Sequence, residues 1–347
     1  MPAISRPAFR TSMHLTGETA AELIEAAKEA EDAGVHTLFA SELYGNPFVP
    51  LAAVTAATER VRLGTGIALA FVRSPLALAL EAFDMDAITS GRFVLGLGTG
   101  VRRLNEDWHG VENFGGPVAH MREVIAFLRL FEERAHRGES IEMDGDYVKA
   151  HIRGYRRPFK PKAERLPIFL GANQPKMLEL AGEVADGVLG HVFLSERYLR
   201  ETFLPPIEKG LKKSGRARTD FEIGAGLICA IDDRDPALAR RHAAGVLAFY
   251  ATVRTYAPIF ASDGFGENAA RARERFVAGD PEGAIDAITE EMVDTYCAAG
   301  TSDDALRRAR RYEGLIDTLG ISPPRHLCPP ELWAGYRQRM LAVFGGA

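Results

Sequence analysis

Three side chains that can exchange protons stand where apolar segments of this sequence end. Glu42 follows the segment 35–40, His14 follows 8–13, and His191 lies near the end of 186–192. A partly buried carboxyl can titrate high enough to donate a proton, but it can equally cap a helix or pair with an arginine. Each histidine stands alone, and a lone histidine is more often a hydrogen-bonded wall residue. These three residues are the candidate acid–base groups.

A second set of residues, several of them glycines, lies at or near the ends of three other apolar segments and beside Glu42. They are Ser41, Gly66, Ile67, Gly98, Thr99, Gly100, Asn105, Gly171, Ala172 and Asn173. Glycine lets backbone amides approach a flat ring or a phosphate closely, although glycines also simply end strands. Three glycine-bearing ends together favour a ligand cradle.

Several kinds of chemistry have no motif in this chain. It contains no H-E-x-x-H, no clustered Cys and His, no P-loop lysine and no G-x-S-x-G. The run GLGTGV at 96–101 carries valine where the dinucleotide motif needs glycine. We therefore expect no metal site, and we expect the chemistry to belong to a bound organic cofactor.

Composition and charge narrow the class of protein further. The net charge of −5 argues against a nucleic-acid binder. The longest uncharged stretches are interrupted by Arg73 and Pro75, so no membrane span is expected. Three widely separated cysteines give no disulfide framework, which favours a reducing cytoplasm. We expect a cytoplasmic enzyme with a small-molecule substrate.

The elements that must position these residues alternate between strand and helix. Eight apolar segments are expected as strands: 8–13, 35–40, 61–69, 92–98, 166–171, 186–192, 221–231 and 315–321. Helices are expected between them: 19–33, 48–58, 74–91, 117–137, 175–184, 195–213, 236–250 and 302–312, with a further one around Trp333. Thr19 with Glu22 forms a capping box, and Ser74 with Pro75 opens another helix.

Eight strand–helix units predict a (β/α)8 barrel with insertion segments, forming a single domain over 1–347. Its active site would lie at the carboxyl ends of the strands. The competing architecture, an open doubly wound sheet, would need a dinucleotide signature after the first strand, and none is present. The segments 141–165 and 255–280 read as irregular, the second as a lid or loop.

Six motifs, taken in order, resemble the luciferase-like flavin and deazaflavin oxidoreductase superfamily. They are VRLGTGI at 61–67, RSP at 73–75, SGRFVLGLGTG at 90–100, DGDY at 144–147, PIFLGAN at 167–173 and AGEVADG at 181–187. The resemblance implies a (β/α)8 barrel, usually a homodimer. One branch uses reduced FMN and oxygen; the other uses coenzyme F420, a deazaflavin that carries hydride.

The chain is more similar to the F420 branch. By that resemblance the peptide between Gly66 and Ile67 should be cis, and Gly66, Ile67, Gly98, Gly100, Asn105, Gly171 and Ala172 should touch the cofactor. Many F420 enzymes carry an Asp-His pair where Glu42 and Leu43 stand here. The substrate chemistry of those enzymes is therefore not carried over.

The resemblance implies an F420-dependent oxidoreductase that moves a hydride between the deazaflavin and a small organic substrate. Two alternatives remain open: an FMN-dependent monooxygenase and a non-catalytic flavin-binding barrel. Glu42 would serve as the acid–base or cofactor-orienting group. Arg102 and Arg103 could meet the acidic tail of F420 or form a solvated charge pair.

Overall fold

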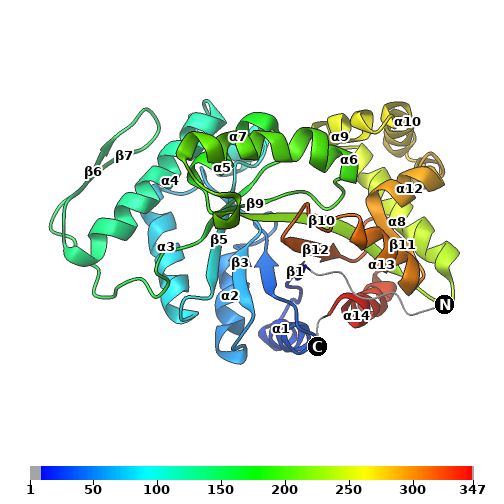
Figure 1. The fold of residues 1–347 in the computed structure, drawn as a ribbon, viewed down its shortest axis with the longest axis horizontal. Helices are drawn as coiled ribbons and strands as arrows, with labels where there is room; N and C mark the ends of the chain where they lie inside the picture. Colours follow the sequence, from blue (N-terminus) through cyan, green and yellow to red (C-terminus); the bar gives the residue numbers. More distant parts are fainter. Residues whose placement is uncertain (1–8, 346–347) are drawn as a thin grey trace.

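Eight parallel strands form a closed ring in the computed structural model, which describes residues 9–345 (Figure 1). In ring order they are β1 (Arg10–His14), β2 (Thr37–Ala40), β3 (Arg62–Thr65), β5 (Phe93–Gly98), β8 (Ile168–Gly171), β9 (Gly187–Leu189), β10 (Glu222–Ile231) and β12 (Thr318–Ser322). Pairing of β12 with β1 closes the ring. The predicted (β/α)8 barrel is confirmed; the predicted start of the first strand, at residue 8, lies outside the described residues.

Helices surround this ring. They are α1 (Ala20–Asp32), α2 (Phe48–Val54), α3 (Pro75–Ile88), α4 (Pro117–Arg134), α5 (Pro175–Val184), α6 (Glu196–Tyr198), α7 (Leu204–Ser214), α8 (Pro236–Ala251), α13 (Ser302–Arg310) and α14 (Trp333–Phe344). The expected caps are present: Thr19 and Glu22 form a capping box, and Ser74 Oγ accepts from Ala77 N at 3.2 Å. Every residue of β2 and β5 is buried, as expected for parallel strands covered on both faces.

The third predicted strand is divided. The segment 61–69 forms β3 and the short β4 (Ala68–Leu69), which are separated by Gly66 and Ile67. Both parts pair with β5, so the interruption is a bulge at the carboxyl end of one barrel strand.

The segment 255–280, predicted to be irregular, is mostly helical. It contains α9 (Ala257–Ser262) and α10 (Gly266–Val277), and α11 (Pro281–Asp286) and α12 (Glu290–Tyr296) follow. The prediction was wrong because α10 buries only alanines, Ala269 and Ala272, so no stripe of large apolar residues marks it. A further strand, β11 (Cys297–Gly300), was also missed; it pairs with the far end of β10, outside the ring.

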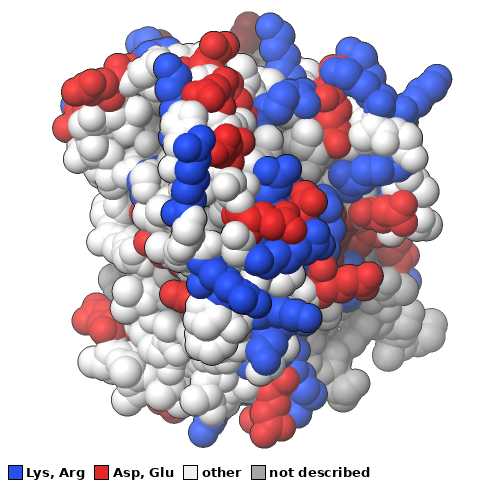
Figure 2. Space-filling model, turned by 90° about the vertical axis from the view of Figure 1, so that its left-hand side faces the viewer, with Lys and Arg blue, Asp and Glu red and all other residues white. Residues whose placement is uncertain are grey.

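The other segment predicted to be irregular, 141–165, contains a β-hairpin. Its strands are β6 (Ile141–Asp144) and β7 (Lys149–Ile152). The hairpin projects beyond α4 in Figure 1. Figure 2 shows the face on this side of the molecule, where basic and acidic side chains are interspersed. One such pair, Arg153 with Glu142 at 2.7 Å, lies on the hairpin.

A charged cluster lies where the strands of the barrel begin. Arg10 and Arg62 contact Glu222 Oε2 at 3.1 and 2.9 Å, and Thr318 Oγ1 donates to Glu222 Oε1 at 2.8 Å. Burial alone would raise the pKa of Glu222, but Arg62, Thr318 and Arg10 together hold it below its ordinary value. These contacts join β1, β3, β10 and β12 across the ring.

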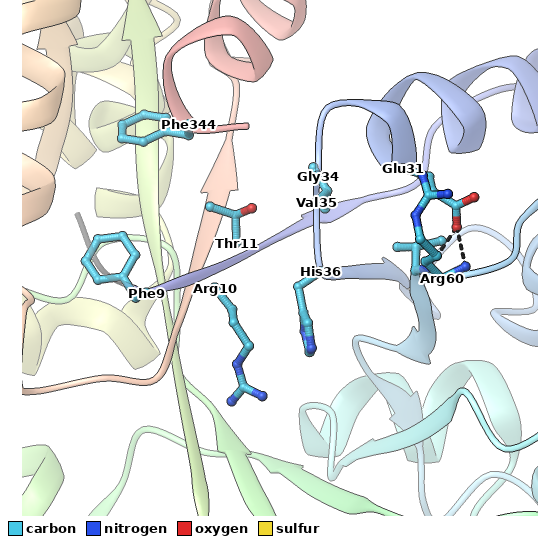
Figure 3. Close-up of a pocket in the computed structure, with 10 residues that line it drawn as sticks. Phe9, Arg10, Thr11, Glu31, Gly34, Val35, His36, Arg60 and Phe344 are labelled. Atoms are coloured by element: carbon cyan, nitrogen blue, oxygen red, sulfur yellow. Dashed lines mark hydrogen bonds between the residues drawn. The ribbon is translucent and has the colours of Figure 1, made fainter. Parts of the chain in front are cut away.

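A cavity of about 370 Å³ opens at the same end of the barrel (Figure 3). Its lining includes Phe9, Arg10, Thr11, His36 and Phe344. Because Arg10 begins β1 and His36 precedes β2, this cavity lies at the end opposite to the predicted site residues. Within residues 9–345, none of the helices combines the length and the hydrophobicity that a membrane span requires.

Candidate active site

All of the residues predicted for the site lie on one rim of the barrel. His14 ends β1, Ser41 and Glu42 follow β2, and the remainder stand at or just after the ends of β3, β5, β8 and β9: Gly66, Ile67, Gly98, Thr99, Gly100, Asn105, Gly171, Ala172, Asn173 and His191. Because the strands are parallel and form a closed ring, their carboxyl ends meet on one face. The barrel therefore collects these side chains although they span most of the sequence.

The bulge after β3 contains the cis peptide predicted between Gly66 and Ile67. The bulge is bonded to the end of β2: Gly66 N donates to Ala40 O at 2.8 Å, and Glu42 N donates to Ile67 O at 3.0 Å. A side chain at position 66 would collide with Phe39, whose Cβ would lie 2.8 Å from the added carbon. Glycine is needed there because of this close approach.

The Ile67 side chain lies against two glycines of neighbouring strands. A Cβ at Gly98 would lie 2.7 Å from Ile67 Cδ1, and a Cβ at Gly171 would lie 2.8 Å from Ile67 Cγ2. Glycine is therefore needed at positions 98 and 171 to leave room for the Ile67 side chain. This explains the two glycines more specifically than the ending of the strands does. Ile67 is half-buried, so it presents an apolar surface between the ends of β5 and β8. We call Ile67 with Gly98 and Gly171 the Ile67 platform.

Asn105 stands beside this platform with a free acceptor. It lies in a π-helical turn (Leu104–Trp108), and its Nδ2 donates to Thr99 O at 2.8 Å and Val101 O at 3.0 Å. Those two carbonyls fix the amide orientation, because an oxygen in that place would face two acceptors. Asn105 Oδ1 is buried and has no partner within residues 9–345. A buried acceptor without a donor costs about 1–3 kcal/mol, so this oxygen is available to a ligand.

Both carboxylate oxygens of Glu42 are already bonded. Arg73 contacts Oε1 at 2.5 Å and Oε2 at 3.0 Å, and Leu69 N donates to Oε2 at 2.6 Å. The same arginine pairs with Glu81 at 3.1 Å. Burial raises the pKa of Glu81, with Arg73 opposing this shift and Glu42 adding to it. The Glu42 side chain thus connects the ends of β2 and β4, and it forms no hydrogen bond with His14 or His191.

The two rim histidines are held in the neutral form. Burial, with the charge of Arg325 beside it, lowers the pKa of His14 to about 4, although the imidazole stays accessible from the rim. Burial lowers the pKa of His191 to about 3. Neither imidazole is therefore a ready proton donor near neutral pH. His191 N donates to Asn173 Oδ1 at 3.0 Å, which fixes the loop after β9.

Aromatic side chains form the wall around His191. Its ring centroid lies 4.2 Å from that of Tyr256 and 4.8 Å from those of Tyr250 and Phe193. Further along, His326 stacks on Phe249 at 3.7 Å. Tyr250, Tyr256 and His326 were not predicted from the sequence, because they come from α8 and from connecting segments with no local signal of a site.

Arg102 and Arg103, considered for the cofactor tail, are paired within their own turn. Arg102 contacts Glu106 at 2.7 Å and Arg103 contacts Asp107 at 3.3 Å. Arg73, by contrast, was not predicted as a site residue, although it lies in one of the matched motifs. A carboxylate shielded from water needs a cationic partner, and this requirement of Glu42 was the signal that could have identified Arg73.

Comparisons with known proteins agree with this geometry. The sequence profile of the family described as luciferase-like monooxygenase matches residues 3–319. The 5,10-methylenetetrahydromethanopterin reductase of Archaeoglobus fulgidus is 30% identical over 310 residues, which cover 85% of this chain and 88% of that protein. A Mycobacterium tuberculosis protein named as a coenzyme F420-dependent oxidoreductase is 30% identical over 320 residues, covering 87% and 89%.

The fold comparison gives the same class. The coenzyme F420-dependent tetrahydromethanopterin reductase from Methanopyrus kandleri superposes with a TM-score of 0.81 over 98% of both chains, at 23% identity. The fold and the rim define a (β/α)8-barrel oxidoreductase. The chain belongs to the luciferase-like monooxygenase family, whose relatives include F420-dependent reductases.

Proposed function

We propose that this protein is an F420-dependent oxidoreductase that moves a hydride between the deazaflavin and a small organic substrate. The observation that carries the proposal is the Ile67 platform, where a half-buried apolar side chain is flanked by two strand ends without side chains. A flat ring fits such a surface. The names of one relative at 30% identity and of the Methanopyrus kandleri reductase support F420 as the ring.

The residues around the platform suit a deazaflavin. Ile67 would lie under the ring, and Asn105 Oδ1 would accept a hydrogen bond from it. Ser41, Thr99, Gly100, Ala172 and Asn173 would complete the surrounding wall from β2, β5 and β8. F420, when bound, would carry the hydride, as donor in its reduced form or as acceptor in its oxidised form. The protein supplies position and excludes water.

Glu42 is proposed as a cofactor-orienting group. Its bonds to Arg73 and Leu69 fix the segment that follows the bulge. With both oxygens occupied, it is better placed to hold that segment than to donate a proton. His14 and His191 remain proposals as groups that contact the substrate.

An FMN-dependent monooxygenase is the second candidate function, because the matching family profile is named for monooxygenases. Titration of the purified protein with F420 and with FMN in parallel, followed by fluorescence, separates the two. We expect micromolar binding of F420 and much weaker binding of FMN. The opposite order would contradict the proposal, and tight binding without turnover of any substrate would favour a non-catalytic barrel.

A matched pair of glycine variants tests whether the platform holds the ring. Gly171→Ala puts a carbon 2.8 Å from Ile67, whereas Gly45→Ala meets nothing within 4 Å and lies on the loop after β2. Overpacking of this kind costs about 1–3 kcal/mol. We expect Gly171→Ala to weaken F420 binding about tenfold and Gly45→Ala to leave it unchanged. The homodimer and the cytoplasmic location remain predictions.

A further inference from the structure

Arg325 is a cation on the rim without an acidic partner. It lies in the loop between β12 and α14, with its guanidinium carbon 5.3 Å from the centroid of the Trp333 ring. Within the described part of the chain it forms no ion pair or hydrogen bond with a carboxylate. The charged group that acts on it is another cation, Arg337, which is itself paired with Glu29. Arg325 is exposed, so its guanidinium is open to a ligand as well as free of an ion pair with the described residues.

The neighbours of Arg325 belong to the candidate active site. Its charge acts on His14 at the end of β1 and on His326, the next residue along the chain. His326 stacks on Phe249 and lies 5.7 Å from Tyr250, whose ring in turn lies 4.8 Å from His191. Arg325 therefore shares one part of the rim with both candidate histidines.

The loop that carries Arg325 lies across the barrel from the Ile67 platform. Arg325 follows β12, which lies opposite β5 in the ring, and His14 ends the neighbouring β1. His191 follows β9, next to β8, at the edge of the platform. A substrate that meets a ring on the platform would extend toward Arg325. The Arg325 guanidinium would thus contact the substrate rather than the reacting face of the cofactor.

No carboxylate balances the charge on this side. The influences on His14, His191, His326 and Tyr250 are burial, Arg325 and Tyr256, and none comes from Asp or Glu. Two other cations of the rim are paired, Arg73 with Glu42 and Arg102 with Glu106. An exposed cation without a counter-charge attracts anionic groups, and arginine binds carboxylates and phosphates through charge-assisted hydrogen bonds.

We propose that the substrate is an organic anion, whose carboxylate or phosphate group binds the Arg325 guanidinium beside His14 and His326. The inference rests on the proposed function, because it assigns a substrate class to the same rim. The planar fork of arginine suits both groups, since each can accept two parallel hydrogen bonds. The aromatic rings of Phe249, Tyr250 and Tyr256 would pack against the organic part.

Calorimetric titration of the full-length protein, without cofactor, tests the anion site. The probes are benzoate, inorganic phosphate and the neutral benzyl alcohol. We expect at least one of the two anions to bind and benzyl alcohol to bind far more weakly. Arg325→Gln should weaken anion binding about tenfold or more, and Arg325→Lys should retain part of it. Arg153→Gln, on the hairpin, is the control and should bind like the wild type. Circular dichroism establishes that each variant is folded.

Three results would overturn the inference. The first is that neither anion binds the wild type. The second is an unchanged anion affinity in folded Arg325→Gln. The third is that Arg325→Gln weakens F420 binding about tenfold while a deazaflavin lacking the phosphate and glutamate tail binds as before, because Arg325 would then hold the cofactor. If the wild type binds benzoate through Arg325 but does not bind F420, the anion site stands and the proposed function fails.

Discussion

At the residue scale, the contact between Glu42 and Arg73 bears on whether Glu42 is an acid–base group or a cofactor-orienting group. A free carboxyl at the end of β2 would be available to a substrate, whereas this one is bonded to two nitrogens of Arg73 and to Leu69 N. Side-chain exposures of 10% for Glu42 and 12% for Arg73 show that the pair is largely shielded from water. An ion pair that is shielded from water fixes the positions of its two side chains, because loss of one partner leaves the other charge buried and unpaired.

Glu42→Gln tests this reading. The amide keeps an acceptor for Leu69 N but loses the ionic pair, so we expect a loss of about 2–3 kcal/mol in unfolding free energy. F420 affinity should fall several-fold because the segment after the bulge shifts. Urea denaturation and F420 titration measure both. Glu106→Gln removes an exposed pair and should cost under about 1 kcal/mol. Wild-type stability and wild-type F420 affinity in Glu42→Gln would instead favour the acid–base role.

At the scale of elements, an aromatic stack joins the hairpin to the bulge. His120 of α4 lies between Phe71, 3.8 Å away and nearly parallel, and Tyr147 of the hairpin turn, 4.7 Å away. Phe71 follows β4 by two residues, so the stack runs from the inserted hairpin to the rim. Tyr147 Oη also accepts from Gly116 N at 2.9 Å, and Glu123 accepts from the backbone of the turn. The insertion is thereby fixed to the barrel.

Removal of the Tyr147 ring should loosen this connection. We expect Tyr147→Ala to lower the unfolding free energy by about 3 kcal/mol and Tyr147→Phe, which loses only the hydroxyl acceptor, by about 1 kcal/mol. Lys149→Ala, an exposed position on the same hairpin, should change it little. Chemical denaturation measures all three. Equal stability of the Ala and Phe variants would show that the ring stack contributes nothing.

At the scale of the whole molecule, the ring of strands has two ends with different tasks. The carboxyl ends carry the candidate site. The other end carries Glu222 with Arg10, Arg62 and Thr318, whose contacts link four strands across the barrel. The candidate site draws on strands from both halves of the sequence. Contacts that fix these strands at one end of the barrel therefore also fix the relative positions of their other ends, which carry the site.

Glu222→Gln should therefore destabilise the barrel, by about 3 kcal/mol at pH 7, because Arg62 and Arg10 lose their counter-charge. The pKa of Glu222 is lowered in the folded protein, so its contribution is present above the pKa of the unfolded chain, about 4.5, and is lost as the pH falls through the folded value. The difference in unfolding free energy between the wild type and Glu222→Gln should narrow below about pH 4.5. Urea denaturation from about pH 2.5 to about pH 7 measures this difference. Glu208→Gln, exposed on α7, is the control. A difference that stays constant with pH would contradict the linkage.

Much of the fold was predictable because its signals are local. Apolar runs of strand length alternate with capped amphipathic segments, and the Thr19 box and the Ser74–Pro75 start were both found as predicted. Where local signals were weak, prediction failed. Helix α10 packs through alanines, and β11 is four small residues, Cys297 to Gly300, that become a strand by pairing with β10.

The sequence by itself determined which residues reach the rim, because the carboxyl ends of parallel strands must converge once eight of them close. It also determined the bulge, through the motif shared with the family. Only the tertiary structure decided which side chains contact one another at the rim. Ile67 meets Gly98 and Gly171, Glu42 meets Arg73, and Phe249 stacks on His326. Such contacts depend on ring closure and side-chain direction, which no spacing along a single chain encodes.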